Sequence, residues 1–291
     1  MGSAPLVTAI IIVLNGERYI DEAIRSIVDQ SLARWELLVV DDGSADGTRD
    51  RVAHWCDRDA RIRLLRHPDH GNHGMSASRN LGLETARGTY VGFLDADDVW
   101  TPEKLAQQVA ILEREPDTAM VYGRTLIWHD WSEGGRPNFF YDLGVAPDRT
   151  YAPPRIFLQL LRNVYQTPTT CNALMRTDRC REVGGFHDEF RTLFEDQVFF
   201  AKMLACFPVH VADACWAKYR QYPGGTSSYD ADDATVRRLH LAYLRAVDGY
   251  LARRPGLHLR GRAAIWRKIG EVRAEPVLRS VRRKLRRFVS R

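Results

Sequence analysis

Strand and helix signals alternate along the first 125 residues, and this alternation limits the folds open to the chain more than any other feature of the sequence. A continuous run of β-branched and aliphatic residues at 7–14 predicts a strand buried on both faces, because a half-exposed strand would carry polar residues at every second position. From Ile20 to Val28 the apolar residues instead recur at helical spacing. The two signals continue to alternate, with strands expected at 35–40, 62–65, 90–94 and 118–125 and helices at 48–57, 76–85 and 101–113. This order predicts an α/β fold, a mostly parallel sheet flanked by helices.

After residue 126 the alternation ends. Residues 126–152 are rich in Trp, Gly, Pro and Asp, which indicates a long functional loop. Hydrophobic spacing further along predicts a strand at 171–176 and helices at 195–205, 236–251 and 277–289. We interpret residues 1–230 as the main domain and residues 231–291 as a C-terminal helical extension.

The composition excludes several classes of protein. Hydrophobic residues make up 45% of the chain and charged residues 27%, which is typical of a globular protein rather than a disordered or fibrous one. The longest apolar run, at 9–14, is far shorter than the roughly 18–20 residues that cross a bilayer, so we expect no transmembrane helix and no secretory signal. The five cysteines form no CxxC pair and are odd in number, which favours buried thiols and a reducing, cytoplasmic location.

Positive charge is concentrated at the C-terminal end. Residues 253–291 carry fourteen Lys or Arg and two Glu, whereas the rest of the chain has more acidic than basic side chains. Apolar residues recur on one side of 277–291, so this basic amphipathic segment fits an anionic membrane surface, in a cytoplasmic protein the inner face of the plasma membrane. The alternative is a solvated tail. No base-reading module accompanies the arginines, so we expect no specific nucleic-acid partner.

Two predicted strands, which we expect to be neighbours, end in clusters of aspartate. Asp41 and Asp42 follow one strand, and Asp95, Asp97 and Asp98 follow the other. Ligands of open α/β sheets bind at the carboxyl ends of the strands, and converging carboxylates repel one another unless a cation is present. Their hard oxygens suit Mg²⁺ or Mn²⁺ bound together with a diphosphate. Taken singly, such aspartates are usually turn formers or helix caps.

Six short segments, in their order and spacing, resemble the family 2 glycosyltransferases of the GT-A fold. They are VTAIIIVLN at 7–15, LLVVDDGSADGT at 37–48, SASRNLGLETARGTYVGFLDADD at 76–98, VGGFHDEF at 183–190, FEDQVFFAKM at 194–203 and YRQYPGGTSS at 219–228. The resemblance implies a Rossmann-like, mostly parallel sheet and an inverting transferase that uses a nucleotide sugar, most commonly a UDP-sugar. It also implies a nucleotide-sugar half at about 1–125 and an acceptor half at about 126–230.

The resemblance places the donor nucleotide at the ends of the first strands. Asp42, with Asp41 beside it, would contact the base or ribose, since an ionised carboxylate only accepts hydrogen bonds. Leu14, Asn15 and Glu17 would lie at the same base pocket. Leu14 departs from the family pattern, which usually has an aromatic residue there, and so removes one stacking surface.

The D-x-D motif of the family is matched by Asp95, Ala96 and Asp97. The resemblance implies that Asp97 ligates the divalent metal, Mn²⁺ or Mg²⁺, and that Asp95 orients the ribose or donor sugar and shares the ion. Asp98 is interpreted as a cap of the next helix. Arg79 matches a position near the nucleotide or diphosphate; the alternative is an arginine on the surface of a helix.

The catalytic base is expected in the Glu195-Asp196 pair, which matches the E-D motif of the family. We assign Asp196 as the base that deprotonates the acceptor hydroxyl and Glu195 as its support; the alternative is a pair of carboxylates favoured by a helix N-terminus. Many relatives have a histidine that reaches the metal where this chain has Tyr222. Arg220 or the 224–228 loop is therefore expected to cover the diphosphate.

Weaker signals have simpler explanations. His67, His70 and His73 share a Gly-rich loop, but no Cys or spaced His completes a zinc site, so we expect solvated loop histidines. Trp128 and Trp131 would either stack on an acceptor sugar or pack a loop.

The resulting hypothesis is a metal-assisted glycosyltransferase that adds one sugar to a glycan or lipid-linked acceptor in cell-surface polysaccharide synthesis. Single addition is favoured because the chain has neither the Q-x-x-R-W segment nor the transmembrane helices of processive synthases. Two alternatives stay open: a nucleotidyltransferase that makes sugar nucleotides, and a catalytically inactive binding protein on the same fold.

Overall fold

The computed structural model describes residues 4–129, 131, 136–191, 193–222, 232–254 and 259–289, the last of these as backbone alone from residue 276 onward. Its strands are β1 (Val7–Val13), β2 (Trp35–Asp41), β3 (Ile62–Arg66), β4 (Tyr90–Asp95), β5 (Val99–Trp100), β6 (Met120–Trp128), β7 (Arg149–Tyr151), β8 (Leu174–Arg176) and β9 (Val209–Arg220). Its helices are α1 (Ile20–Val28), α2 (Thr48–Arg58), α3 (Met75–Thr85), α4 (Lys104–Arg114), α5 (Arg155–Arg162), α6 (Thr177–Glu182), α7 (Glu195–Cys206), α8 (Asp233–Ala252) and α9 (Leu259–Val289).

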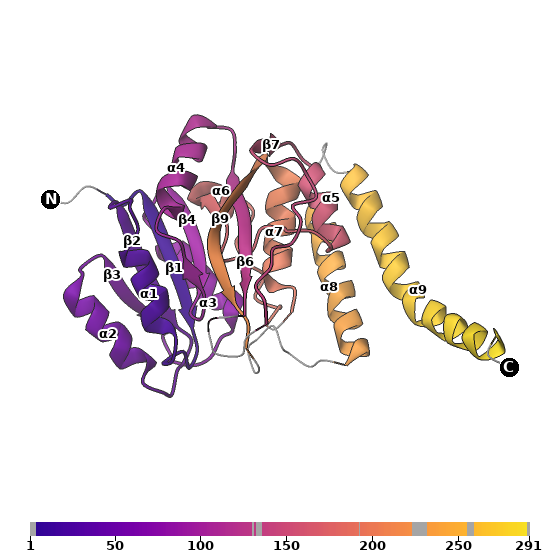
Figure 1. Ribbon diagram of the computed structural model, residues 1–291, viewed down its shortest axis with the longest axis horizontal. Helices are drawn as coiled ribbons and strands as arrows, with labels where there is room; N and C mark the ends of the chain where they lie inside the picture. Colours follow the sequence, from indigo (N-terminus) through magenta and orange to yellow (C-terminus); the bar gives the residue numbers. More distant parts are fainter. Residues whose placement is uncertain are drawn as a thin grey trace.

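The strands form one sheet in the order β3-β2-β1-β4-β8-β6-β9-β5, and β7 pairs with β9 (Figure 1). Strands β3, β2, β1 and β4 are parallel, and so are β6 and β9. Only the short strands β8, β5 and β7 run antiparallel to their partners within the described residues. The prediction of a mostly parallel α/β sheet flanked by helices is therefore confirmed.

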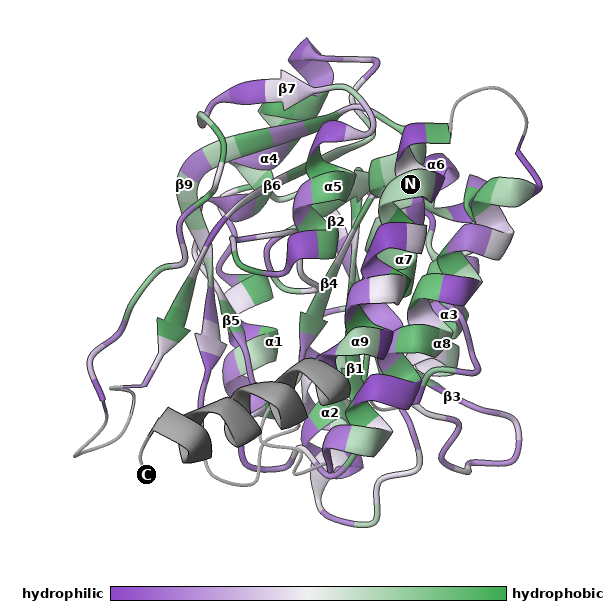
Figure 2. Cartoon of the chain, turned by 90° about the vertical axis from the view of Figure 1, so that its right-hand side faces the viewer, coloured by the Kyte–Doolittle hydropathy of each residue, from purple (hydrophilic) through white to green (hydrophobic). Residues whose placement is uncertain are grey.

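Both faces of the sheet are buried, which explains the unbroken aliphatic run in β1. Ile10 and Ile12 join one hydrophobic core, with α3 and α5 to α9, whereas Ile11 and Val13 join the other, with α1, α2 and α4. Helices on the first face, such as α7 and α8, mix hydrophobic and hydrophilic residues along their length (Figure 2). Because no residue of β1 faces water, every position of the strand is aliphatic or small.

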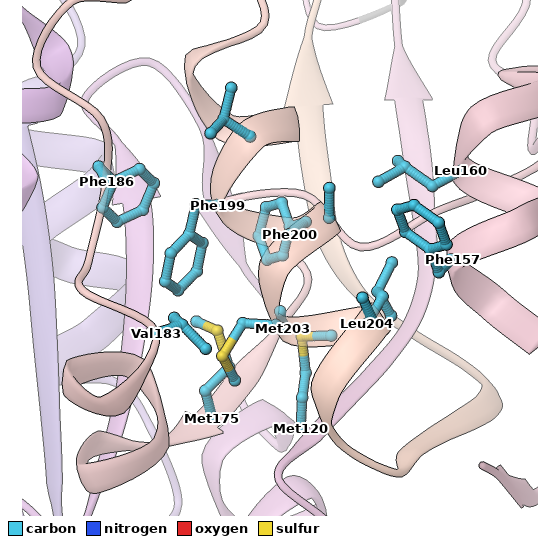
Figure 3. Packing of buried hydrophobic residues seen from close by; sticks show 14 of the residues in the cluster. Met120, Phe157, Leu160, Met175, Val183, Phe186, Phe199, Phe200, Met203 and Leu204 are labelled. Carbon is cyan, nitrogen blue, oxygen red and sulfur yellow. The ribbon is translucent and has the colours of Figure 1, made fainter. Parts of the chain in front are cut away.

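Helix α7 carries the expected catalytic pair in its first turn and runs through the larger core (Figure 3). Phe199 of α7 stacks on Phe186 with ring centroids 4.2 Å apart. Phe200 and Leu204 lie on the side of the helix nearer Phe157 of α5. A helix packed on several sides cannot shift without disturbing the core, so its first turn has a fixed position.

Strand β9 was not expected from the sequence. Its twelve residues pair with β6 in a register that shifts twice, around Arg124, and this breaks the alternation of buried and exposed positions. Helices α5 and α6 and the short strands β5 and β7 were also missed. The expected loop at 126–152 was too long at both ends, because β6 continues to Trp128 and β7 begins at Arg149.

The C-terminal helices pack on the main domain. Tyr243 and Val247 of α8 and Ile265 and Ile269 of α9 are buried in the same core as α7. The last helix begins at Leu259 rather than at residue 277. No helix among the described residues is long and apolar enough to span a bilayer. The five cysteines are free thiols, of which Cys171 and Cys180 are buried and the others half-buried.

Candidate active site

The register of the sheet brings two of the expected carboxylates to one edge. Asp41 at the end of β2 pairs with Val13, and Asp95 at the end of β4 pairs with Ile12. From the sequence, these two strands were expected to be neighbours. This was wrong, because β1 lies between them. Neighbouring strands lie about 4.8 Å apart, so the two clusters are separated by about two such spacings. This leaves room for a ligand at the end of β1.

A cleft of about 1000 Å³ opens at this edge. Ten of the twelve expected site residues line it, namely Leu14, Asn15, Asp42, Arg79, Asp95, Ala96, Asp97, Glu195, Asp196 and Arg220. Asp41 and Glu17 do not. Asp41 is buried and its Oδ1 accepts the N–H of Ser44, as in an aspartate that shapes a turn. Glu17 accepts the N–H of Gly47 in a shallower neighbouring pocket.

Asp42 holds the loop before α3. Its Oδ1 accepts the backbone N–H of His73 at 2.8 Å, and its Oδ2 accepts that of Gly74 at 2.9 Å. His67 also lies 3.4 Å from Oδ1. The carboxylate therefore orders the rim of the cleft, and its remaining lone pairs are the part that can face a ligand.

The expectation that His67 is a solvated loop histidine was wrong. Its side chain is buried, its Nε2 forms a hydrogen bond of 2.9 Å with Ser78 Oγ, and its ring stacks on His73 at 4.2 Å. His70 is exposed. The burial of His67 depends on α3, which folds over the loop.

Asn15 joins the end of β1 to the loop after β2. It adopts a positive φ of 52°, its N–H donates to Ser44 Oγ, and its Oδ1 accepts the N–H of Ala45 at 2.8 Å. Leu14 beside it is 45% exposed and faces the cleft, where it supplies an apolar surface.

Arg79 joins the two carboxylate motifs of the cleft. Its Nη2 donates to Asp95 Oδ1 at 2.8 Å, and its Nη1 donates to Glu195 Oε1 at 3.2 Å. The side chain is buried, so the alternative of an arginine on a helix surface is wrong. Burial alone would lower the pKa of Arg79, but the charges of Asp95 and Glu195 raise it above its usual value.

Asp97 and Asp98 are held by the last residue of β9 and by the segment that follows it. The Tyr222 hydroxyl donates to Asp97 Oδ2 at 2.9 Å, and the backbone N–H of Arg220 donates to Asp98 Oδ1 at 2.9 Å. The expectation that Asp98 caps the next helix was wrong, because α4 begins only at Lys104. Burial, and then the neighbouring carboxylates, raise the pKa of both aspartates.

The guanidinium of Arg220, which lines the cleft, is held by groups of the protein. It donates from Nε to the Asp97 carbonyl at 2.7 Å and pairs with Glu22. The aromatic rings of Trp128 and Trp131 lie 4.5 and 4.9 Å from it. Both tryptophans therefore pack against Arg220. This agrees with the alternative in which they pack a loop. The 224–228 loop, which was expected to cover the diphosphate, lies outside the described residues.

Asp196 lines the cleft one residue after Glu195. Burial, and then the charge of Glu195, raise the pKa of Asp196 to about 7, although Arg79 acts in the opposite direction. Phe194, just before the pair, has a φ of 68°, which is costly for a bulky residue. Its ring stacks on Tyr243 of α8 at 5.5 Å, so a C-terminal helix supports the turn that presents Asp196.

Several further residues of the cleft were not found from the sequence. Thr170 donates to Asp95 Oδ2 at 3.1 Å, which fixes the second oxygen of this carboxylate. Tyr19 lies beside Tyr222 with ring centroids 5.2 Å apart. Neither belongs to a recognisable motif, and only the fold brings them to the site.

The donor set at this edge fits a divalent cation. Oδ1 of Asp97 accepts no side-chain hydrogen bond from any other residue in the described parts of the chain, and Asp97 lines the cleft. The same parts hold no cluster of three or more His, Cys, Asp or Glu side chains that could hold a metal alone. A site with so few carboxylate oxygens suits Mg²⁺ or Mn²⁺ when a diphosphate supplies the other ligands.

Comparisons with known proteins show the family of the chain. The chain matches the family model described as Glycosyl transferase family 2 over residues 8–184, more than half of its length. It is 37% identical over 126 residues to TuaG of Bacillus subtilis, which is assigned by name to teichuronic acid biosynthesis, and the match covers 43% of this chain and 49% of that protein. It is also 37% identical over 118 residues to the UDP-Glc:alpha-D-GlcNAc-diphosphoundecaprenol beta-1,3-glucosyltransferase WfgD of Escherichia coli, covering 40% of this chain and 45% of WfgD. The chain thus spans about half the length of these relatives.

Two solved structures share the fold at low sequence identity. TarS of S. aureus in complex with UDP-GlcNAc has a TM-score of 0.69 at 20% identity, over 91% of this chain and 71% of that one. A mannosyltransferase of Pyrobaculum calidifontis in complex with GDP-Man and Mn²⁺ has a TM-score of 0.60 at 18% identity, over 92% of this chain and 70% of that one.

Proposed function

The chain belongs to glycosyltransferase family 2, and on that premise we propose that it transfers one sugar, with inversion, from a nucleotide sugar to a glycan or lipid-linked acceptor. A UDP-sugar is the donor we favour, since TarS and WfgD are named with UDP-sugars. Cell-surface polysaccharide synthesis is the proposed setting, because TuaG is named for teichuronic acid biosynthesis and WfgD for a lipid-linked acceptor.

The observation that carries this proposal is that Asp97 and Asp196 line one cleft. Arg79 joins the two motifs to which they belong, through its bonds to Asp95 and Glu195. Inverting transfer needs the leaving diphosphate and the attacking hydroxyl on opposite faces of the sugar, so two acidic sites must flank it. Asp97 serves the diphosphate side and Asp196 the hydroxyl side in this proposal.

The chemical step follows from these positions. The acceptor hydroxyl attacks the anomeric carbon, its proton passes to the carboxylate of Asp196, and the bond from the anomeric carbon to the phosphate oxygen breaks with its electron pair leaving on the diphosphate. The raised pKa of Asp196 makes it a stronger base than an exposed aspartate. Glu195, held by Arg79, keeps the first turn of α7 in place.

A divalent cation, Mn²⁺ or Mg²⁺, would be held by Asp97 and, through its remaining lone pairs, by Asp95. When bound, it would neutralise the charge that develops on the departing diphosphate. Asp42, Asn15 and Leu14 would hold the nucleoside at the end of β1 in this arrangement.

The proposal extends to an anionic membrane surface for the C-terminal helices. On the outer side of α9 the residues Leu259, Ala263, Trp266 and Gly270 are exposed at helical spacing, and Leu259 and Trp266 are 86% and 55% exposed. Exposed arginines flank this row, a pattern typical of helices that lie in the membrane interface. The side chains at 277–291, which were expected to make this contact, lie outside the described residues.

Vesicle co-sedimentation tests the membrane part. Deletion of 276–291, and separately Trp266→Ala, should each reduce binding to anionic vesicles, with turnover of a soluble donor unchanged. Binding that is equal for all three proteins would refute it.

The transferase activity is tested by incubating the protein with labelled UDP-, GDP- and dTDP-sugars, Mn²⁺ and bacterial lipid-linked glycans. We expect transfer of one labelled sugar from one donor, and a loss of at least two orders of magnitude for Asp196→Asn. Gln107, whose side chain accepts from Trp216 outside the cleft, offers a control as Gln107→Glu. Product made equally by wild type and Asp196→Asn would contradict the assignment of the base.

A further inference from the structure

We propose that Tyr222 is a positioning residue for Asp97: its hydroxyl holds one carboxylate oxygen so that the other faces the cleft and binds a divalent cation. This inference rests on the proposed function, since it concerns the metal that the function requires. It assigns Tyr222 no ligand role of its own.

Arg220, the last residue of β9, and Tyr222, two residues after it, make three hydrogen bonds to the Asp97-Asp98 turn. The Tyr222 hydroxyl donates to Asp97 Oδ2 at 2.9 Å, and Arg220 donates from Nε to the Asp97 carbonyl at 2.7 Å and from its backbone N–H to Asp98 Oδ1 at 2.9 Å. The residues that meet here are more than 120 positions apart in the sequence. Only the Tyr222 bond acts on the carboxylate that we assign to the metal.

The ring of Tyr222 is itself held in place. Tyr19 lies 5.2 Å from it and Trp131 6.2 Å from it, measured between ring centroids. The Arg220 guanidinium lies 4.8 Å from the Tyr19 ring and 4.9 Å from the Trp131 ring, so the aromatic side chains surround a cation. A ring held in this way keeps its hydroxyl within hydrogen-bond distance of Asp97 Oδ2.

This geometry leaves Oδ1 of Asp97 for the cation. A carboxylate with one oxygen held by a hydrogen bond cannot rotate freely about its Cβ–Cγ bond, so the second oxygen keeps its direction. Partners of this kind, which orient a metal ligand without touching the metal, typically change metal affinity by about 10–100-fold when they are removed. Loss of the hydroxyl should therefore weaken metal binding while the fold is preserved.

The test compares Tyr222→Phe with wild type by the electron paramagnetic resonance signal of free Mn²⁺, titrated in the presence of UDP. We expect the variant to bind Mn²⁺ about 10–100-fold more weakly. The control is Tyr151→Phe, which also removes a phenol hydrogen bond, to the Ala146 carbonyl, but away from the cleft. It should leave Mn²⁺ affinity unchanged, and both variants should unfold within a few degrees of wild type.

Two results would overturn the inference. Equal or tighter Mn²⁺ binding by Tyr222→Phe, with wild-type binding that is lost in Asp97→Ala, would refute the role of Tyr222 and leave the proposed function standing. If wild type itself bound no Mn²⁺ in an Asp97-dependent manner, the inference and the metal-assisted function would fail together. A kinetic measurement separates orientation from folding: the Mn²⁺ concentration for half-maximal rate should rise, and the rate at saturating Mn²⁺ should recover.

Discussion

The guanidinium of Arg79 donates to the carboxylate of Asp95 at 2.8 Å from a side chain that is only 1% exposed. Because the same guanidinium also holds Glu195, a single buried cation joins the end of β4 to the first turn of α7. The end of β4 carries Asp95 and leads into Asp97, the proposed metal ligands, and α7 carries the proposed base. The distance between the two sides of the reaction therefore depends on Arg79.

Replacing Arg79 should damage both stability and activity. Arg79→Met leaves two carboxylates without their cation, and breaking a buried ion pair typically costs about 3–5 kcal/mol. Arg79→Lys keeps the charge but lacks the planar fork that reaches both partners, so we expect a smaller loss of stability and a large fall in kcat/KM. Urea unfolding and donor turnover measure the two effects.

Arg87 provides the matched control, because it pairs with Glu36 but is exposed and far from the cleft. Arg87→Lys should change the free energy of unfolding and kcat/KM little. The account would be wrong about Arg79 if Arg79→Lys had the kinetics of wild type.

The rate should depend on the ionisation of Asp196. Burial raises its pKa to about 7, and a general base acts only when deprotonated. We therefore expect kcat/KM to rise with pH through about 7 and to level off above it. Steady-state rates from pH 5.5 to 9, at constant Mn²⁺ and ionic strength, give the profile. A rate that stays constant over this interval would contradict the assignment.

The same carboxylate should reduce stability at alkaline pH. The folded protein holds the proton of Asp196 more tightly than the unfolded chain does. The stability that this proton contributes is therefore fully present below the pKa of Asp196 in the unfolded chain and is lost as the pH rises through its pKa in the folded protein. Asp196→Asn carries no such charge. Its free energy of unfolding should exceed that of wild type at pH 8 and match it more nearly at pH 4.5. The reverse order in urea unfolding would disprove this explanation.

Lys104, which does not line the cleft, offers a second test of buried charge. Its ammonium group is buried near Gln108 and the carbonyls of Asn172 and Ala173, and burial lowers its pKa to about 7. The unfolded chain therefore binds more protons between about pH 7 and pH 10, and stability from this group rises with pH over that interval. Lys104→Met should remove this rise in unfolding free energy, as measured in urea. An unchanged slope would show that Lys104 is charged in the fold.

The first half of the fold could be predicted from the sequence because each element has one consistent environment. Helix α1 was predicted with its observed bounds, since its apolar face meets the sheet at every helical turn. Strand β9 could not be predicted, because the shifts of its pairing around Arg124 remove the period on which prediction depends. The start of α4 was expected too early, because Thr101 and Pro102 form a turn before Lys104.

The candidate site was predicted in its residues but not in its contacts. Asp42, Asp95 and Asp97 reach one cleft because parallel strands end at the same edge of a sheet. Their partners come from segments far along the chain: Glu195 is 116 residues from Arg79, and Tyr222 is 125 residues from Asp97. No local pattern encodes such contacts, so only the folded chain reveals which carboxylates are held and by what.

The central claim, a metal-dependent nucleotide site at Asp97, is tested most directly by calorimetric titration with UDP, GDP and dTDP, with and without Mn²⁺, on wild type and Asp97→Ala. The account predicts that one nucleotide, UDP in our proposal, binds wild type tightly only when Mn²⁺ is present, and that Asp97→Ala loses this binding. Absence of binding by all three nucleotides, or binding that needs neither Mn²⁺ nor Asp97, would contradict it.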